Sequence, residues 1–359
     1  MYYPTENEKN EIVKQLLAAP SDSHAAYPSF EAYLNHYISI VCGGVKVDFP
    51  SLQSHDDVLQ CVKSLYEQYS LSRNDITRSW FPGRGSVPAE REHILRIVVN
   101  VAFMIDINEK DYYPELFNSE GPHRAKWEKD QAFVDFLEKS FLPLQRGAAT
   151  NVNLGNKKSL KAWKLTRRYG ITIMATDNLL EHLLYNPKEH TLRIFHHISY
   201  LRSHLKHSKD MDLELDFSQS LGLKTLPPRL LFETLLSLQM ILFPIAVSSY
   251  KPSKVLLKKC IKEQRFDKEL LFFETVREIP PDFTFKYWAE RIERLQEITE
   301  RPPPRGAVLS WLERHTSERN ALTIAIVGLF LSAFFGFLGV IIGALQLALA
   351  WLAWKYPTS

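Results

Sequence analysis

A long uncharged run near the C-terminal end constrains this chain more than any other feature of its sequence. The run covers the 34 residues from Ala321 to Trp354, and only Thr323, Ser332 and Gln346 interrupt its apolar character. About 20 apolar residues in a helix cross the hydrocarbon core of a bilayer, and charged residues are costly there. The run therefore predicts a membrane anchor.

The anchor is longer than one upright span requires. A straight helix of this length would measure about 51 Å, against a hydrocarbon thickness of about 30 Å. Three arrangements remain: a tilted single helix, one span continued by an interfacial stretch, or a hairpin that turns at residues 335–339. The arms of a hairpin would have only about 15 residues each, short of the roughly 20 needed, so a single span is favoured.

Small residues in the anchor could support helix pairing. They are Ser332, Gly336, Gly339 and Gly343, and the last two form a GxxxG motif. Such spacing allows two helices to approach closely, so self-association through the anchor is one expectation. The plainer explanation is that glycine is frequent in membrane helices.

Charges beside the run predict its orientation. Four arginines (301, 305, 314 and 319) precede it and only Lys355 follows it. The excess of positive charge on the upstream side predicts that the N-terminal part stays cytosolic. Residues 1–11 show no secretory signal, and five residues follow Trp354, so we expect a tail-anchored protein of an intracellular membrane whose organelle the sequence does not indicate.

Composition predicts that most of the chain is a folded globule. Hydrophobic residues make up 45% and charged residues 24% of the 359 residues, which leaves room for about two soluble domains. With 44 basic and 41 acidic side chains the net charge is only +3, so nucleic acid is not favoured as a partner. The three cysteines lack CxxC spacing, which argues against a disulfide framework or a thiolate zinc site.

Hydrophobic periodicity predicts a mainly α (α+β) fold. Apolar residues recur at helical spacing over residues 30–41, 58–69, 90–105 and 131–141, which predicts a helical N-terminal region over 1–145. Gly, Asn and Thr then predict a linker at 146–158.

Short alternating elements are expected after this linker. Ser159 begins a predicted helix that Gly170 ends, and a strand follows over 171–175. Asp177 is expected to cap a helix over 178–185, before a strand over 191–195 and a helix over 198–207. This α-β-α-β-α order is similar to a winged-helix module.

The remaining boundaries complete the expected organisation. Helices are predicted over 227–243, as the central core helix, and over 285–300. We thus expect a winged-helix-like and helical domain at 159–300, a Pro-rich spacer with a juxtamembrane helix at 301–319, and a transmembrane anchor at 320–354.

Few residues suggest chemistry. The best metal candidates are His197, His204 and His207 at i, i+7 and i+10, but they lack an acidic partner and an HExxH motif, so a structural role is favoured. Arg193, His196 and His197 are the candidate lining of a polar pocket. No nucleophile motif is present, so we single out no catalytic residue and expect neither a cofactor nor a metal.

The C-terminal 200 residues carry a resemblance. Residues 176–183 (TDNLLEHL), 192–197 (LRIFHH), 226–228 (LPP), and 303–306 (PPRG) followed by 311–314 (WLER) resemble a family of uncharacterised fungal proteins. Its members share the apolar tail, and the resemblance implies a fungal setting without implying an activity or a ligand.

Three functions remain open on this sequence. The leading expectation is a non-catalytic binding or scaffold protein whose partners are the lipid bilayer and an unknown protein. The alternatives are an enzyme at the membrane surface with an unrecognised site and a membrane-tethered DNA-binding regulator.

Overall fold

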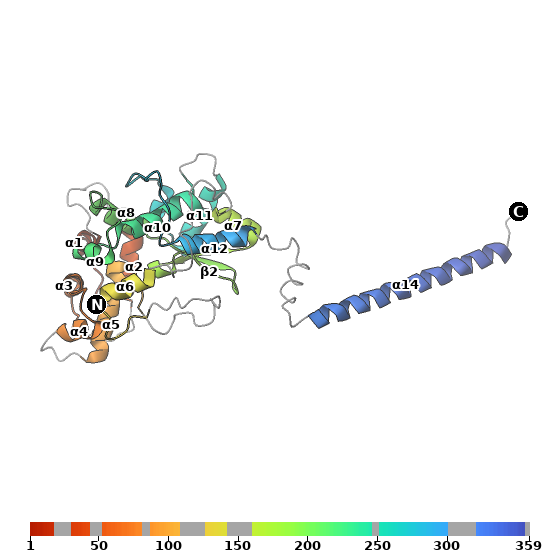
Figure 1. The fold of residues 1–359 in the computed structure, drawn as a ribbon, viewed down its shortest axis with the longest axis horizontal. Coiled ribbons are helices and arrows are strands. Elements are labelled where there is room, and N and C mark those ends of the chain that lie inside the picture. The colour runs from red at the N-terminus through yellow and green to blue at the C-terminus, as the bar shows by residue number, and fades with distance from the viewer. Residues whose placement is uncertain are drawn as a thin grey trace. The chain divides into compact units, whose positions relative to one another are not determined.

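The computed structural model describes residues 1–17, 30–43, 52–80, 87–107, 126–141, 160–245, 251–300 and 321–355. Two compact units are present, Met1–Glu300 and Arg301–Ser359. The first is mainly helical with one small three-stranded sheet, so the mainly α (α+β) prediction is confirmed (Figure 1).

Helices dominate the N-terminal part, as its periodicity predicted. In chain order they are α1 (Glu6–Leu17), α2 (Glu31–Val41), α3 (His55–Glu67), α4 (Arg73–Ser79), α5 (Pro88–Phe103) and α6 (Phe133–Phe141). Four of them match the predicted windows. Local chemistry sets their ends: Ser54 and Asp57 form a capping box at the start of α3, and Pro88 occupies the first turn of α5.

A mixed sheet follows α7 (Ala162–Tyr169), which ends at Gly170 in the left-handed conformation with φ 67°. The strands are β1 (Thr172–Thr176), β2 (Leu184–Asn186) and β3 (Thr191–Phe195), in the order β1-β3-β2. β1 and β3 run parallel, with Thr176 opposite Phe195, whereas β2 and β3 form an antiparallel hairpin.

One predicted helix is wrong. Residues 178–185 form a single 3₁₀ turn, η3 (Leu179–Glu181), and then strand β2. The Asn178 side chain accepts the N–H of Leu180 in a tight local turn, and Leu184 and Tyr185 pair with β3. Sheet pairing thus overrides the local helix signal, and the resulting order gives no support to a winged-helix module.

The later helices begin with α8 (Ile198–His207), which lies where it was predicted. They continue with α9 (Phe217–Gly222), α10 (Pro228–Leu236), the π-helical turn η4 (Ser237–Leu242), α11 (Lys251–Gln264), the 3₁₀ turn η5 (Lys268–Leu271) and α12 (Ala289–Glu300). The predicted core helix over 227–243 is therefore α10 with η4, and the helix predicted from Phe285 begins four residues later.

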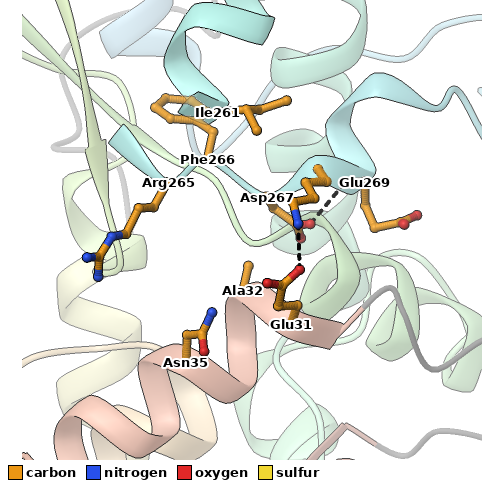
Figure 2. A pocket seen from close by; sticks show the side chains of 9 residues that line it. Glu31, Ala32, Asn35, Ile261, Arg265, Phe266, Asp267 and Glu269 are labelled. Atoms are coloured by element: carbon orange, nitrogen blue, oxygen red, sulfur yellow. Dashed lines mark hydrogen bonds and ion pairs between the residues drawn. The ribbon is translucent and has the colours of Figure 1, made fainter. Parts of the chain in front are cut away.

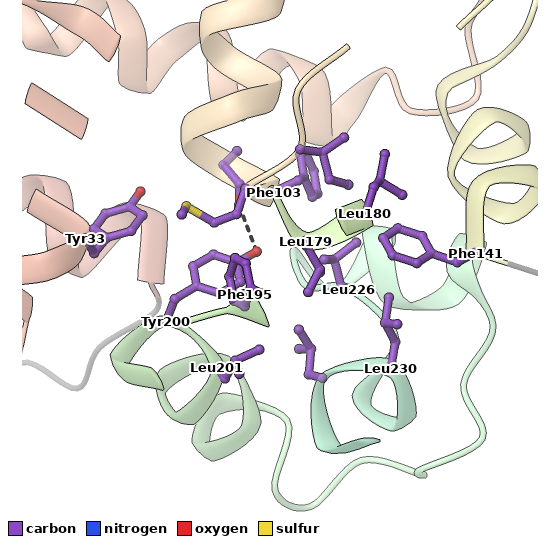
Figure 3. Close-up of a cluster of buried hydrophobic side chains, with 14 of the residues drawn as sticks. Tyr33, Phe103, Phe141, Leu179, Leu180, Phe195, Tyr200, Leu201, Leu226 and Leu230 are labelled. Atoms are coloured by element: carbon purple, nitrogen blue, oxygen red, sulfur yellow. Dashed lines mark hydrogen bonds between the residues drawn. The ribbon is translucent and has the colours of Figure 1, made fainter. Parts of the chain in front are cut away.

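One hydrophobic core joins the parts on either side of the expected linker, which lies outside the described residues. Tyr33 stacks on Tyr200 with ring centroids 6.2 Å apart, and the Tyr200 hydroxyl donates to the carbonyl of Ala102 (Figure 3). Phe141 stacks on Phe217 at 5.9 Å. Residues 1–300 therefore bury their apolar side chains as one unit.

The second unit contains a single described helix, α14 (Ala321–Lys355), of 35 residues. It runs without interruption through residues 335–339, where the hairpin alternative placed a turn (Figure 1). Within it, Gly328–Leu352 is long and apolar enough to cross a membrane, with a mean hydropathy of 2.3. The expected spacer and juxtamembrane helix at 301–319 lie outside the described residues.

Candidate functional site

The parallel pair of strands brings an aspartate and two histidines to one edge of the sheet. Asp177 follows β1 directly, and His196 and His197 follow β3 directly. Since Thr176 and Phe195 are register partners in parallel strands, the residues after them emerge side by side. His36 joins them from α2, so three imidazoles surround one carboxylate.

Short distances connect the four side chains. Asp177 Oδ1 lies 2.6 Å from His197 Nε2 and 3.2 Å from His196 Nε2. Asp177 Oδ2 lies 3.4 Å from His36 Nδ1. The three histidines are buried, whereas the Asp177 side chain is 51% exposed, so the cluster opens to solvent through its carboxylate.

A second layer of polar groups fixes two of the rings. His36 Nε2 lies 2.6 Å from Asn100 Oδ1 of α5. The backbone N–H of Asp267 donates to His196 Nδ1 at 3.2 Å, and the Asp267 carboxylate accepts the backbone N–H and the hydroxyl of Ser199. Helix α5 and the loop after α11 therefore hold the histidines in place.

Electrostatics favours a charged aspartate beside neutral imidazole. Burial by itself would raise the pKa of Asp177, but hydrogen bonds from the neighbouring imidazoles, first of all from His196 and His197, hold it well below its usual range. Burial, with His196 beside it, lowers the pKa of His197 to about 3. At neutral pH the site thus presents a carboxylate and a neutral His197 ring.

The three histidines considered from the sequence as metal ligands are not brought together. His197 lies at the N-terminal end of α8 in the Asp177 cluster, His204 is buried against Tyr200, and His207 is exposed. In the described part of the chain, the side chains close enough to hold one metal ion are His36, Asp177 and His197, whose ligand atoms lie within 4.8 Å of one another.

The predicted polar pocket is only partly assembled. His196 and His197 stack with ring centroids 4.2 Å apart. Arg193 instead forms an ion pair of 2.6 Å with Glu181, a different carboxylate from that of the histidine cluster.

A small cavity adjoins the cluster. It has a volume of about 240 Å³ and lies between α2 and the segment that follows α11 (Figure 2). Phe266 and Asp267, which line it, also contact His196, through ring stacking at 5.2 Å and through the backbone hydrogen bond. An ion pair of 2.7 Å between Glu31 and Lys268 lies on its wall.

A larger, more open hollow of about 890 Å³ lies beside α4 and α5. Basic side chains line it, but several already have partners within the fold: Arg73 pairs with Glu92 at 2.7 Å, and Arg96 pairs with Asp106 at 3.4 Å. Part of its positive charge is therefore used in internal ion pairs.

The small residues of the anchor lie on one side of α14. Ser332, Gly336, Gly339 and Gly343 are spaced by four, three and four residues, so they share a helix face. Within the described chain, no heavy atom lies within 4 Å of a Cβ built on any of the three glycines. This face therefore has room for a second helix.

Sequence reasoning missed His36, Asn100 and the role of Asp177, which it assigned to a helix cap. The available signal was positional: His196 directly follows a predicted strand, and Asp177 lies two residues after another. This positional signal would have identified the site only together with the knowledge that the two strands are parallel neighbours.

Comparison with known proteins adds no relative: no family model, curated protein or solved structure matches the chain.

Proposed function

We propose that this protein is a tail-anchored protein of an intracellular membrane, with the compact unit Met1–Glu300 in the cytosol as a non-catalytic binding or scaffold domain. The observation that carries the proposal is the apolar segment Gly328–Leu352 of α14, none of which is buried within the fold. An exposed apolar surface of this size is not stable in water and needs a lipid or protein environment.

The dimensions of this segment suit one span. Its 25 residues correspond to about 37 Å of helix, which a tilt of about 37°, within the range of membrane helices, fits into about 30 Å of hydrocarbon. At its C-terminal end, Lys355 Nζ lies 4.8 Å from the ring centroid of Trp351. An aromatic ring with a lysine at a helix end is typical of the membrane interface.

Orientation and family complete the proposal. The four arginines before α14, against one lysine at its end, favour a cytosolic N-terminal unit.

A binding role is favoured over an enzyme because the chain has no recognisable nucleophile motif. Membership of the fungal family that the C-terminal 200 residues resemble is part of the proposal.

Membrane fractionation tests the anchor. We expect the full chain to stay in the membrane pellet after washes with high salt and with alkaline carbonate, because its attachment is hydrophobic. A variant that ends at residue 320 is the matched control and should be soluble. Extraction of the full chain by carbonate, or a pelleted truncated variant, would contradict the anchor.

Orientation and partner need separate measurements. Protease added to intact organelles should digest the compact unit and spare α14 if the unit faces the cytosol. Protection of the compact unit would overturn this orientation.

Proximity labelling by the full chain, compared with the chain that ends at residue 320, should identify protein partners that depend on membrane attachment.

A further inference from the structure

The His36 ring in the cluster around Asp177 has one buried nitrogen without a hydrogen-bond partner among the described residues. His36 Nε2 lies 2.6 Å from Asn100 Oδ1, an acceptor, so this nitrogen carries the ring proton. In neutral His36, Nδ1 is then a bare lone pair. It is buried without a hydrogen-bond partner among the described residues and faces Asp177 Oδ2 at 3.4 Å.

Two acceptors that face each other at this distance repel, unless a proton or a metal cation lies between them. A lone pair on imidazole and a carboxylate oxygen are both good ligands for a divalent metal ion. The hydrogen bond from His36 Nε2 to Asn100 is the second-layer contact that metal-binding histidines usually make, since it fixes the tautomer and aims the other nitrogen.

His197 supplies the third ligand atom. Its Nε2 lies 2.6 Å from Asp177 Oδ1, and its ligand atom and those of His36 and Asp177 all lie within 4.8 Å of one another. Coordination through Nε2 requires the tautomer of the His197 ring that carries its proton on Nδ1.

His196 has a different part in the cluster. Its Nδ1 accepts the backbone N–H of Asp267, so Nε2 carries the proton and donates to Asp177 Oδ1 at 3.2 Å. His196 therefore orients the carboxylate and is not a ligand itself. Metal-binding carboxylates are commonly held in this way by a second hydrogen bond.

The ligand set indicates the class of metal. Two imidazole nitrogens and one carboxylate oxygen suit a first-row transition ion such as Zn²⁺, whereas Mg²⁺ and Ca²⁺ prefer oxygen ligands. Because Asp177 is half exposed, solvent reaches the site and can complete the coordination. Structural zinc sites are usually closed by four protein ligands, whereas three protein ligands with an open fourth position are the pattern of catalytic zinc sites, so this site bears on the enzyme alternative.

We propose that His36, Asp177 and His197 bind a Zn²⁺-class divalent ion, with Asn100 and His196 as positioning residues. The ion joins α2 to the carboxyl ends of β1 and β3, three segments that are distant in the sequence. This site is independent of the membrane anchor, so the two proposals can fail separately.

Metal titration of the full chain tests the site. The protein is purified in detergent without a histidine tag and titrated with Zn²⁺ against a chromophoric chelator. We expect one equivalent of Zn²⁺ to bind. Asp177→Asn and His36→Gln should each weaken binding by at least 100-fold, and Asn100→Ala by roughly the 10–100-fold typical of second-layer contacts.

Three controls make the result decisive. His207→Gln removes an exposed histidine of α8 outside the cluster and should leave Zn²⁺ affinity unchanged. Near-ultraviolet circular dichroism shows whether each variant keeps its fold, and Asp177→Asn preserves the shape of the side chain. Mg²⁺ in place of Zn²⁺ should not compete.

Several outcomes would overturn the proposal: no saturable Zn²⁺ binding by the wild type, equal affinity in folded Asp177→Asn and wild type, or tighter binding of Mg²⁺ than of Zn²⁺. A loss of affinity in His207→Gln equal to that in His36→Gln would place the metal elsewhere.

Discussion

The carboxylate of Glu233, buried in α10, accepts the backbone N–H of Tyr287 at 2.8 Å. It also accepts the N–H groups of Lys286 and Trp288 and the side chain of Arg229. These three N–H groups lie in the segment that directly precedes α12. Glu233 thus fixes the entry to a helix more than fifty residues away.

Removal of this carboxylate should be costly. Glu233→Ala leaves three buried backbone N–H groups without their acceptor and removes one of the two carboxylates paired with Arg229, so we expect a loss of about 3–5 kcal/mol in the free energy of unfolding. Urea unfolding of the detergent-solubilised chain measures it. Glu297→Ala, at an exposed position of α12, should stay within about 0.5 kcal/mol of wild type. Equal effects of the two variants would show that the Glu233 carboxylate does not hold this segment.

His204 should make stability depend on pH. Burial, with a contribution from His207, lowers the pKa of His204 from 6.5 to about 3. Below pH 6.5 the His204 side chain therefore takes up a proton in the unfolded chain and stays neutral in the folded chain. The stability linked to this group is complete above pH 6.5 and is lost as pH falls toward 3, by about 1.4 kcal/mol per pH unit.

Denaturant unfolding between pH 7 and pH 5 checks this dependence. In His204→Leu the slope of stability against pH should decrease by one proton, while the buried His182, whose pKa burial also lowers, keeps its own contribution. His207→Gln, at an exposed position, should retain nearly the full slope. An unchanged slope in His204→Leu would contradict the prediction.

The small-residue face of α14 predicts self-association in the membrane. Replacement of Gly339 and Gly343 by isoleucine fills the space that a second helix would use. We expect association, measured by energy transfer between labelled chains in vesicles, to weaken on the order of tenfold, or about 1.4 kcal/mol. Ala348→Ile, on the opposite face, is the matched control; an equal loss there would indicate a nonspecific effect.

The shared core predicts that residues 159–300 do not fold by themselves. Without the N-terminal helices, Tyr200 and Phe217 lose their contacts with Tyr33 and Phe141. A fragment of residues 159–300 should bind a hydrophobic dye and lack near-ultraviolet circular dichroism, while residues 1–300 show a native spectrum. A cooperatively unfolding 159–300 fragment would instead support a domain boundary at 146–158.

Elements with a strong local signal could be predicted from the sequence, whereas contacts between distant segments could not. Both ends of helix α8 were predicted correctly, because apolar side chains recur along it at helical spacing. His197, the residue before it, belongs to no competing secondary-structure pattern. Residues 184 and 185 of strand β2 were predicted as helix, since this strand exists only through pairing with β3. The metal candidates failed for the same reason: i, i+7 spacing placed His204 beside His197, but the partners of His197 come from α2 and the end of β1.

The sequence by itself determined the apolar segment of α14 and the mainly helical class, because hydrophobicity and periodicity are local properties of the chain. Only the tertiary structure decided that β1 and β3 are parallel neighbours and that α2 packs beside their ends. These two facts bring His36, Asp177 and His197 together. The physical reason is that parallel pairing and core packing are nonlocal: their free energy depends on which segments meet, and the spacing of residues along one segment does not encode that choice.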